Sequence, residues 1–215
     1  MVYLPPHFAE TDLAAMHALI REVPLGILIT TGSEGLTANH IPFVLDTRTG
    51  AQGRLLAHVA RNNPVWHDHA PDEHVLVVFQ SAEAYISPNW YRSKQETGEV
   101  VPTWNYAVVH ASGPLIIHDD PKWVRGQAGM LTKQEEAAQP HPWKMADAPQ
   151  EYTAGMLANI VGIEIPIARL IGKTKASQNR REDDRDGAIA ALQATGDPGD
   201  ATMAAIMDTV RQRAN

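Results

Sequence analysis

The chain has 215 residues, 44% of them hydrophobic, and a formal net charge of −7 at pH 7. This length allows a sizeable buried core, and we expect one domain over residues 1–215. The acidic balance disfavours strong non-specific binding to nucleic acid, and the absence of cysteine excludes disulfides, thiolate metal sites and cysteine catalysis.

The sequence contains no apolar run of about 18 residues that would span a membrane. Its N-terminus, MVYLPPHFAE, lacks the basic and apolar regions of a secretory signal. We therefore expect a cytoplasmic protein that does not enter a membrane.

The first part of the chain predicts one helix followed by short strands. Thr11 or Asp12 can cap a helix that runs to about Glu22 and is closed by Pro24. Strands are expected at residues 25–31, 36–45, 54–60 and 74–81, separated by turns rich in glycine, asparagine and aspartate. A short helix is expected from Pro64 to His69.

The second part combines strands with helices. A long loop is expected at residues 87–102, a strand at 104–118 that bends at Gly113-Pro114, and a strand at 162–171 that is broken by Pro166. Helical additions are expected at about 121–161 and 182–213, and the last helix presents Met203, Ile206, Met207 and Val210 on one face. This order predicts an antiparallel barrel or sandwich with helices.

The stretch from Ala84 to His110 concentrates aromatic residues in a chain that is only 6% aromatic. An aromatic wall with a few polar groups suits a flat, conjugated ligand. The alternative is a packed corner between two strands, and the composition leaves both open. The aromatic residues are Tyr85, Trp90, Tyr91, Trp104 and Tyr106.

Two other segments could hold a phosphate. The turn from His58 to Asn63 combines the planar fork of Arg61 with two asparagine amides, and Lys94 could add a further charge. The segment from Gly172 to Asn179 places two lysines, a serine and two amides after a strand, without the spacing of a nucleotide P-loop. Each could instead be an ordinary turn or a solvated basic loop.

Metal and hydrolase chemistry are not indicated. The cluster His67-Asp68-His69 has an i, i+2 spacing that does not face one way on a helix, and no HExxH motif supports a metal site. No GxSxG motif is present, so Ser87 is not expected to act as a nucleophile. We predict no metal ligands and no catalytic side chains.

Several longer motifs together resemble one family. They are MVYLPPHF, GLTANHIPF, HVARNNP, AYISPNWY, VPTWNY, EIPI and GKTKASQNR, and they cover nearly the whole chain. The chain resembles the PaiB family of FMN-binding negative transcriptional regulators. That family is similar to the split-barrel flavin proteins related to pyridoxamine-phosphate oxidase, which dimerise and bind FMN between subunits. The resemblance implies a mainly β, α+β chain with an antiparallel split β-barrel, flanking and C-terminal helices, FMN as cofactor and a homodimer.

The resemblance also implies roles for particular residues. The ribityl and phosphate end of FMN would be held by His40, Ile41, Phe43, His58, Arg61, Asn62 and Asn63. The isoalloxazine would lie against Ser87, Trp90, Tyr91, Lys94, Thr103, Trp104 and Asn105, from the same or the other subunit. The same site or the dimer interface would be served by Lys173, Ser177, Gln178 and Asn179.

The regulatory role comes from the resemblance alone. No helix-turn-helix with a basic recognition helix is evident, so we expect weak or indirect contact with DNA. A flavin-dependent oxidoreductase acting on a small molecule is an alternative, in which the flavin carries the electrons and the protein positions it. Haem binding or breakdown is a third, since some split barrels handle haem and this chain has ten histidines.

Overall fold

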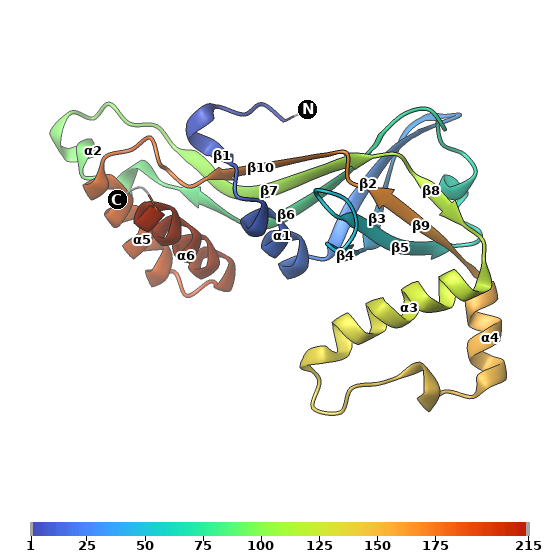
Figure 1. Ribbon diagram of the computed structural model, residues 1–215. Helices are drawn as coiled ribbons and strands as arrows, with labels where there is room; N and C mark the ends of the chain where they lie inside the picture. The colour runs from blue at the N-terminus through green and yellow to red at the C-terminus, as the bar shows by residue number, and fades with distance from the viewer. Residues whose placement is uncertain (1, 214–215) are drawn as a thin grey trace. The chain divides into compact units, whose positions relative to one another are not determined.

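The structure is a computed structural model that describes residues 2–213 (Figure 1). Its strands form a six-stranded sheet in the order β1-β10-β7-β6-β2-β3 and a four-stranded sheet in the order β4-β5-β9-β8. The pairs β2–β3, β2–β6, β4–β5, β5–β9 and β8–β9 are antiparallel. The strands are β1 (Ala9–Glu10), β2 (Leu25–Gly32), β3 (Gly35–Pro42), β4 (Val44–Asp46), β5 (Arg54–Ala60), β6 (Val75–Ile86), β7 (Thr103–Gly113), β8 (Ile116–His118), β9 (Ile160–Pro166) and β10 (Arg169–Lys175).

Helices flank the strands, and no helix of the described residues is long and apolar enough to cross a membrane. The α-helices are α1 (Leu13–Glu22), α2 (Ser93–Glu96), α3 (Pro121–Glu135), α4 (Gln150–Ala158), α5 (Glu182–Ala194) and α6 (Pro198–Arg213). Short 3-10 turns are η1 (Pro6–Phe8), η2 (Pro64–Trp66), η3 (Pro88–Trp90), η4 (Glu136–Ala138) and η5 (Met145–Asp147).

Prolines mark the places where the chain passes from one sheet to the other. The strand expected at 36–45 is divided after Pro42, so that β3 lies in the six-stranded sheet and β4 in the four-stranded one. The bends expected at Gly113-Pro114 and at Pro166 are confirmed, and each again separates strands of different sheets. Proline has no N–H to donate to a ladder, so at each of these points the chain can leave the sheet in which it has been paired.

The chain divides into two compact units, each discontinuous in sequence. The helix-pair unit contains the N-terminal segment up to Leu19, Gln80–Val109 and the C-terminal segment from Ile171, while the barrel unit contains Ile20–Phe79 and His110–Leu170. The strands β6 and β7 each contribute residues to both units. The expectation of a single domain stays a prediction.

The helix-pair unit buries one face of its strands under α5 and α6, which lie side by side (Figure 1). On β6, Ala84 and Ile86 are buried while Tyr85 between them is exposed, as the two-residue period of a strand requires. The last helix buries Met203 and Met207 of its predicted apolar face. The core cluster consists of Ala84, Ile86, Tyr91, Ala176, Ala188, Ile189, Leu192, Met203, Ala204 and Met207.

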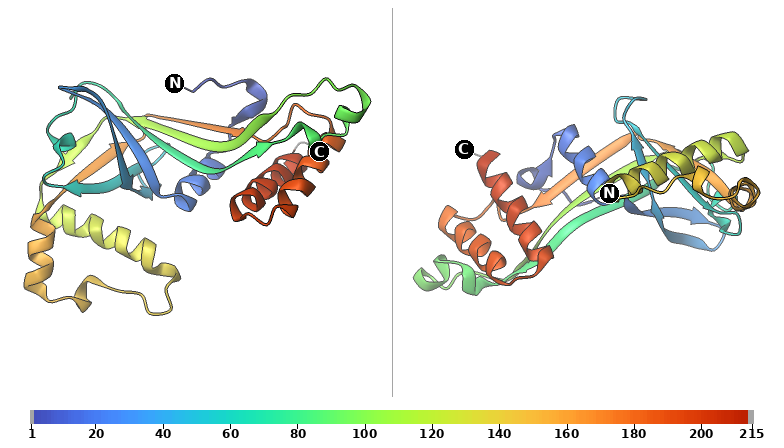
Figure 2. Two further views of the ribbon diagram at one scale, coloured as in Figure 1. Left: turned by 180° about the vertical axis from the view of Figure 1, so that it is seen from behind. Right: turned by 90° about the horizontal axis from the view of Figure 1, so that it is seen from below.

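The barrel unit has its own core and a helical excursion. Phe43 and Phe79 meet edge to face with ring centroids 5.8 Å apart. Between the antiparallel neighbours β8 and β9 the chain leaves the sheet to form α3 and α4, and then returns (Figure 2). Trp123 of α3 stacks on His118 at 4.0 Å and lies over Gly162, where a Cβ would come within 2.2 Å of the indole. Only glycine therefore lets α3 sit this close to β9.

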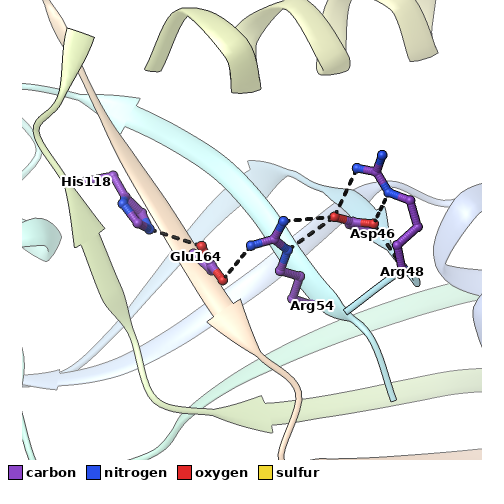
Figure 3. A network of polar contacts seen from close by, with 5 residues as sticks. All are labelled: Asp46, Arg48, Arg54, His118 and Glu164. Atoms are coloured by element: carbon purple, nitrogen blue, oxygen red, sulfur yellow. Dashed lines mark hydrogen bonds and ion pairs between the residues drawn. The ribbon is translucent and has the colours of Figure 1, made fainter. Parts of the chain in front are cut away.

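A chain of polar groups crosses the four-stranded sheet (Figure 3). Asp46 on β4 accepts hydrogen bonds from Arg48 and Arg54, and Arg54 also pairs with Glu164 on β9 at 3.0 Å. His118 on β8 reaches the other oxygen of Glu164 at 3.0 Å. The Arg48 guanidinium, together with Arg54, holds the pKa of Asp46 well below its usual range against the opposing effect of burial. The two buried carboxylates thus have partners, which is the condition for burying charge.

Candidate functional site

The exposed face of the helix-pair unit carries large aromatic side chains. Trp104 on β7 is 54% exposed and Tyr85 on β6 is 45% exposed, and their rings meet edge to face with centroids 5.9 Å apart. The strand period places Tyr106 on the same face as Trp104. Large rings left open beside one another form a surface on which a flat ligand can stack.

Two lysines of β10 border these rings. The amine of Lys173 lies 5.1 Å from the centre of the Tyr106 ring and donates to the backbone oxygen of Tyr3 at 2.9 Å. The amine of Lys175 donates to the backbone oxygen of Trp104 at 2.7 Å and to the hydroxyl of Thr103. Positive charge and aromatic surface therefore occur together at this edge of the strands.

A small cavity of about 100 Å³ opens beside Lys175. Its lining is mainly polar side chains and includes two cations. The lining residues are Val101, Pro102, Thr103, Asn105, Lys175, Ser177, Asn179 and Arg180. Four of them, Thr103, Asn105, Ser177 and Asn179, are residues that the sequence predicted for the cofactor, and the structure brings them together.

Asn105 and Ser177 form the buried part of that lining. Asn105 is fully buried, and its amide donates to the Ser177 hydroxyl at 3.0 Å and contacts the sulfur of Met207 at 3.4 Å. Ser177 has φ of 60°, a left-handed conformation that is strained for a residue other than glycine, asparagine or aspartate. Asn105 thus packs against α6 rather than beside the exposed rings, and it holds Ser177 in its unusual conformation.

The neighbouring amides differ in their roles. Gln178 accepts from the backbone N–H of Ala176 at 2.7 Å and donates to the backbone oxygen of Thr174 at 2.6 Å, so it closes the turn after β10. Asn179 is exposed and lines the cavity. Of these two side-chain amides, only that of Asn179 is available to a ligand.

The loop at residues 87–102 is more ordered than the sequence suggested, because it contains η3 and α2. Ser87 accepts from the Asn89 N–H at 3.2 Å, and Lys94 is bound to the Asn89 side-chain oxygen. Trp90 is partly buried and Tyr91 is 1% exposed, both against the helix-pair core. These two rings therefore pack against the core, as in the packed corner that the sequence left open as the alternative to a ligand-binding wall.

The barrel unit holds the other group of sequence-predicted residues. His40 is exposed on β3, whereas Ile41 and Phe43 are buried in the core. His58 on β5 is bonded through Nδ1 to the Gln127 side-chain oxygen at 2.7 Å. Gln127, from α3, was not anticipated from the sequence because it lies far from His58 along the chain.

Arg61 is already engaged by its surroundings. Its guanidinium pairs with Asp119, with the shorter contact at 2.6 Å, and donates to the backbone oxygens of Ala158 and Ile160 at 2.9 and 3.3 Å. These bonds use four of its roughly five N–H donors. The carboxylate of Asp119 raises the pKa of Arg61. Arg61 thus ties the end of β5 to the excursion between β8 and β9.

The two asparagines after Arg61 serve the turn. Asn63 accepts from the Val65 N–H at 3.0 Å, which caps η2, and its amide donates to Asn39 at 2.8 Å. Asn62 is exposed. Asp68, next to the histidines considered for metal, instead accepts from Ser33, and no group of metal-ligand side chains occurs within residues 2–213.

The residues expected to bind the cofactor do not include two cations of the cavity, Lys175 and Arg180, although Lys175 is one of the two lysines in the basic segment from Gly172 to Asn179. The signal for Lys175 was present, because the alternation in GKTK places Lys173 and Lys175 on one face of a strand. Arg180 follows the same basic segment, and its guanidinium carbon lies 5.2 Å from the centre of the Tyr91 ring, a contact that no local pattern predicts. The exposed rings, hydrogen-bond donors and cations of this unit fit a flat, anionic cofactor such as FMN.

Comparison with known proteins identifies the family. A family model described as "Putative FMN-binding domain" matches residues 2–169. The chain belongs to this family. FMN, expected from the sequence, is thereby confirmed as the family's cofactor.

Relatives extend over most of the chain. An uncharacterized protein of Emericella nidulans is 36% identical over 231 residues, covering 91% of this chain and 92% of that protein. Protease synthase and sporulation protein PAI 2 of Bacillus subtilis is 30% identical over 207 residues, covering 96% of this chain and 97% of that protein. The resemblance to the PaiB family is therefore confirmed.

Solved structures share the fold at low sequence identity. The flavocytochrome Anf3 of Azotobacter vinelandii has a TM-score of 0.56 at 12% identity, covering 83% of this chain and 75% of that chain. The FAD and heme binding protein of Mycobacterium smegmatis has a TM-score of 0.54 at 16% identity, covering 88% of this chain and 80% of that chain. The predicted α+β split barrel with antiparallel sheets is confirmed.

Proposed function

We propose that this chain is an FMN-binding, PaiB-like negative transcriptional regulator that acts as a homodimer with weak or indirect DNA contact. The observation that carries the proposal is the match of residues 2–169 to the FMN-binding family, together with similarity to PAI 2 over nearly the whole chain. The exposed aromatic face of the helix-pair unit supports it, because it offers a flat ligand a stacking surface with the amine of Lys175 beside it.

In this proposal the isoalloxazine lies against the exposed rings. Trp104 and Tyr85 provide the stacking surface, while the amine of Lys175 provides positive charge for the phosphate end of FMN. When bound, FMN supplies one- and two-electron redox chemistry, and the chain binds and orients it. Redox state or occupancy of the flavin would then be the signal that the regulator reads.

The homodimer is proposed on the same surface. Tyr3, Tyr85, Val101 and Trp104 of the helix-pair unit are all between 45% and 82% exposed. A second copy would cover apolar surface that monomeric proteins rarely leave open in large patches. FMN could be enclosed between the copies, as the family resemblance implies.

Direct DNA binding is proposed to be weak because of charge. The net charge is −7. Arginines of the C-terminal helices pair with neighbouring carboxylates, such as Arg211 with Asp186. Such paired arginines release few counterions from a phosphate backbone.

The test begins with the absorption spectrum of the purified protein. We expect flavin bands, release of FMN on denaturation as identified by mass spectrometry, and a dimer in analytical ultracentrifugation. Colourless protein that does not bind added FMN would refute flavin binding, and a monomer at all concentrations would refute the dimer. A gel shift at physiological salt that reveals tight, sequence-specific binding would overturn the weak DNA contact.

The same preparation tests the alternatives. Reduction of the flavin by NADH or NADPH, followed by turnover of an acceptor, would favour the oxidoreductase. A Soret band on titration with haem would favour the haem protein. We expect neither turnover nor a Soret band.

A further inference from the structure

The cavity at the end of β10 has the size of one anionic group. Its volume of about 100 Å³ is too small for a three-ring flavin but holds several water molecules or one tetrahedral oxyanion. The side chains of Lys175, Arg180, Asn179 and Thr103 line it, and all of them carry hydrogen-bond donors. The cavity therefore combines a restricted volume with convergent donors.

Its two cations are not neutralised by a carboxylate. No Asp or Glu is part of the lining, and neither Lys175 nor Arg180 forms an ion pair with a carboxylate anywhere in the described chain. Lys175 is bound to two neutral oxygens, those of Thr103 and Trp104, which leaves about one of its three N–H donors free. Arg180 stacks over the ring of Tyr91, which orients the guanidinium without balancing its charge.

Three carboxylates of the helix-pair unit have hydrogen-bond or ion-pair partners other than these two cations. Asp184 lies within electrostatic range of Arg180, but both of its oxygens accept hydrogen bonds from Ser93. Glu96 and Asp183 both pair with Arg181, the residue after Arg180. Of these two adjacent arginines, Arg181 therefore pairs with carboxylates and Arg180 lines the cavity.

We propose that this cavity is an oxyanion subsite in which Lys175 and Arg180, with Thr103 and Asn179, bind a phosphoryl group. The phosphoryl group of FMN and free phosphate share this chemistry, so the subsite rests on the proposed function only if its ligand is the flavin. A guanidinium with an adjacent ammonium is a common pairing for phosphate.

The electrostatics of Lys175 support this subsite. Burial lowers the pKa of Lys175; the Tyr106 hydroxyl opposes this effect, and the positive charges of Lys173 and Arg180 add to it. A bound dianion would reverse both charge effects, because it places opposite charge within a few ångströms of the amine. The cavity therefore holds cations that a bound phosphoryl group would stabilise.

The test compares FMN, riboflavin and inorganic phosphate on the full-length protein. Wild type, Lys175→Met, Arg180→Met and the control Arg181→Met are titrated with FMN and with riboflavin, and binding is followed by flavin fluorescence. We expect Lys175→Met and Arg180→Met to lower FMN affinity at least tenfold with riboflavin affinity unchanged, and Arg181→Met to change neither. Unchanged riboflavin binding also shows that the variants are folded.

The outcomes separate this inference from the proposed function. Wild-type protein that binds FMN no more tightly than riboflavin, or variants that lose both ligands equally, would overturn the subsite while flavin binding stands. A second outcome is that the protein binds no flavin, but inorganic phosphate raises the melting temperature of the wild type and of Arg181→Met and not that of Lys175→Met or Arg180→Met. This result would support the subsite and refute flavin binding. Protein that responds to none of the three probes would overturn both.

Discussion

Asp184, the third residue of α5, anchors the loop at residues 87–102 by accepting two hydrogen bonds from Ser93. The backbone N–H of Ser93 lies 2.8 Å from Oδ1 and its hydroxyl 2.7 Å from Oδ2. Burial opposes ionisation of Asp184, but the two bonds and the nearby arginines lower its pKa below the usual value. The long loop next to the aromatic face is therefore fixed to the helix pair at its centre.

Removal of this anchor should free the loop. We expect Asp184→Ala to lower the free energy of unfolding by about 1 to 3 kcal/mol, since it leaves the partly buried N–H and hydroxyl of Ser93 without their acceptors. Hydrogen exchange across residues 92–98 should accelerate about tenfold, as measured by mass spectrometry. Asp186→Ala, which removes an exposed partner of Arg211 on the same helix, is the matched control. Equal exchange in both variants would contradict the anchoring role.

Asp46 should control the acid stability of the barrel unit. Hydrogen bonds from Arg48 and Arg54 lower its pKa, so it stabilises the fold above the pKa of an unfolded aspartate, about 4, and this contribution is lost as the pH falls through the lower folded value. We expect Asp46→Asn to cost about 3 kcal/mol at pH 7, since it leaves the half-buried Arg54 with one carboxylate fewer.

Urea unfolding at several pH values measures this effect. The difference between wild type and Asp46→Asn should shrink as the pH is lowered below about 4. Arg92→Gln is the control, because the Arg92 side chain is 71% exposed, lies outside this polar network and forms only a surface pair with Glu96. A pH-independent difference would show that packing rather than charge is responsible.

Substitution by alanine should change the stability of the protein in opposite directions at two helical glycines. A Cβ on Gly187 of α5 would lie 2.2 Å from the backbone oxygen of Trp90, so Gly187→Ala must displace η3 and should destabilise by about 1 to 3 kcal/mol. Gly155 of α4 has open space around it, and Gly155→Ala should stabilise by about 0.5 to 1 kcal/mol. Thermal unfolding of the two variants distinguishes these effects, and a neutral Gly187→Ala would contradict the close packing.

Arg61 should contribute to structure more than to cofactor affinity. Its guanidinium is held by Asp119 and by backbone oxygens, so Arg61→Met should lower the melting temperature and alter FMN affinity less than threefold, or less than about 0.7 kcal/mol. Asp119→Asn should lower the melting temperature in the same way. A tenfold loss of FMN affinity in Arg61→Met alone would instead support the phosphate role that the sequence suggested.

Trp104 should contribute to flavin binding without being needed for the fold. Its side chain is 54% exposed, so Trp104→Ala should leave stability nearly unchanged. Loss of a stacking ring should weaken FMN and riboflavin binding alike, by about tenfold. Trp143→Ala, which removes an exposed tryptophan of the barrel unit, is the control. Equal flavin affinity in the two variants would remove Trp104 from the site.

The sequence by itself determined the local elements and the family. The sequence predicted β5 at residues 54–60 with its observed bounds. Of the two caps expected for the first helix, Thr11 or Asp12, Asp12 accepts the N–H of Ala14, and Pro114 and Pro166 lie at the expected bends. These features follow from side-chain period and backbone chemistry within a few residues. The motifs of the PaiB family likewise needed no tertiary information.

Only the tertiary structure decided what each polar side chain binds. Arg61 is 58 residues from Asp119, Asn105 is 72 residues from Ser177, and Ser93 is 91 residues from Asp184. No local pattern encodes such partners, because they depend on which strands and helices become neighbours after folding. For the same reason the sequence could not choose between its two candidate phosphate segments. The fold pairs Arg61 with Asp119, whereas Lys175 and Arg180 form no ion pair with a carboxylate of the described residues.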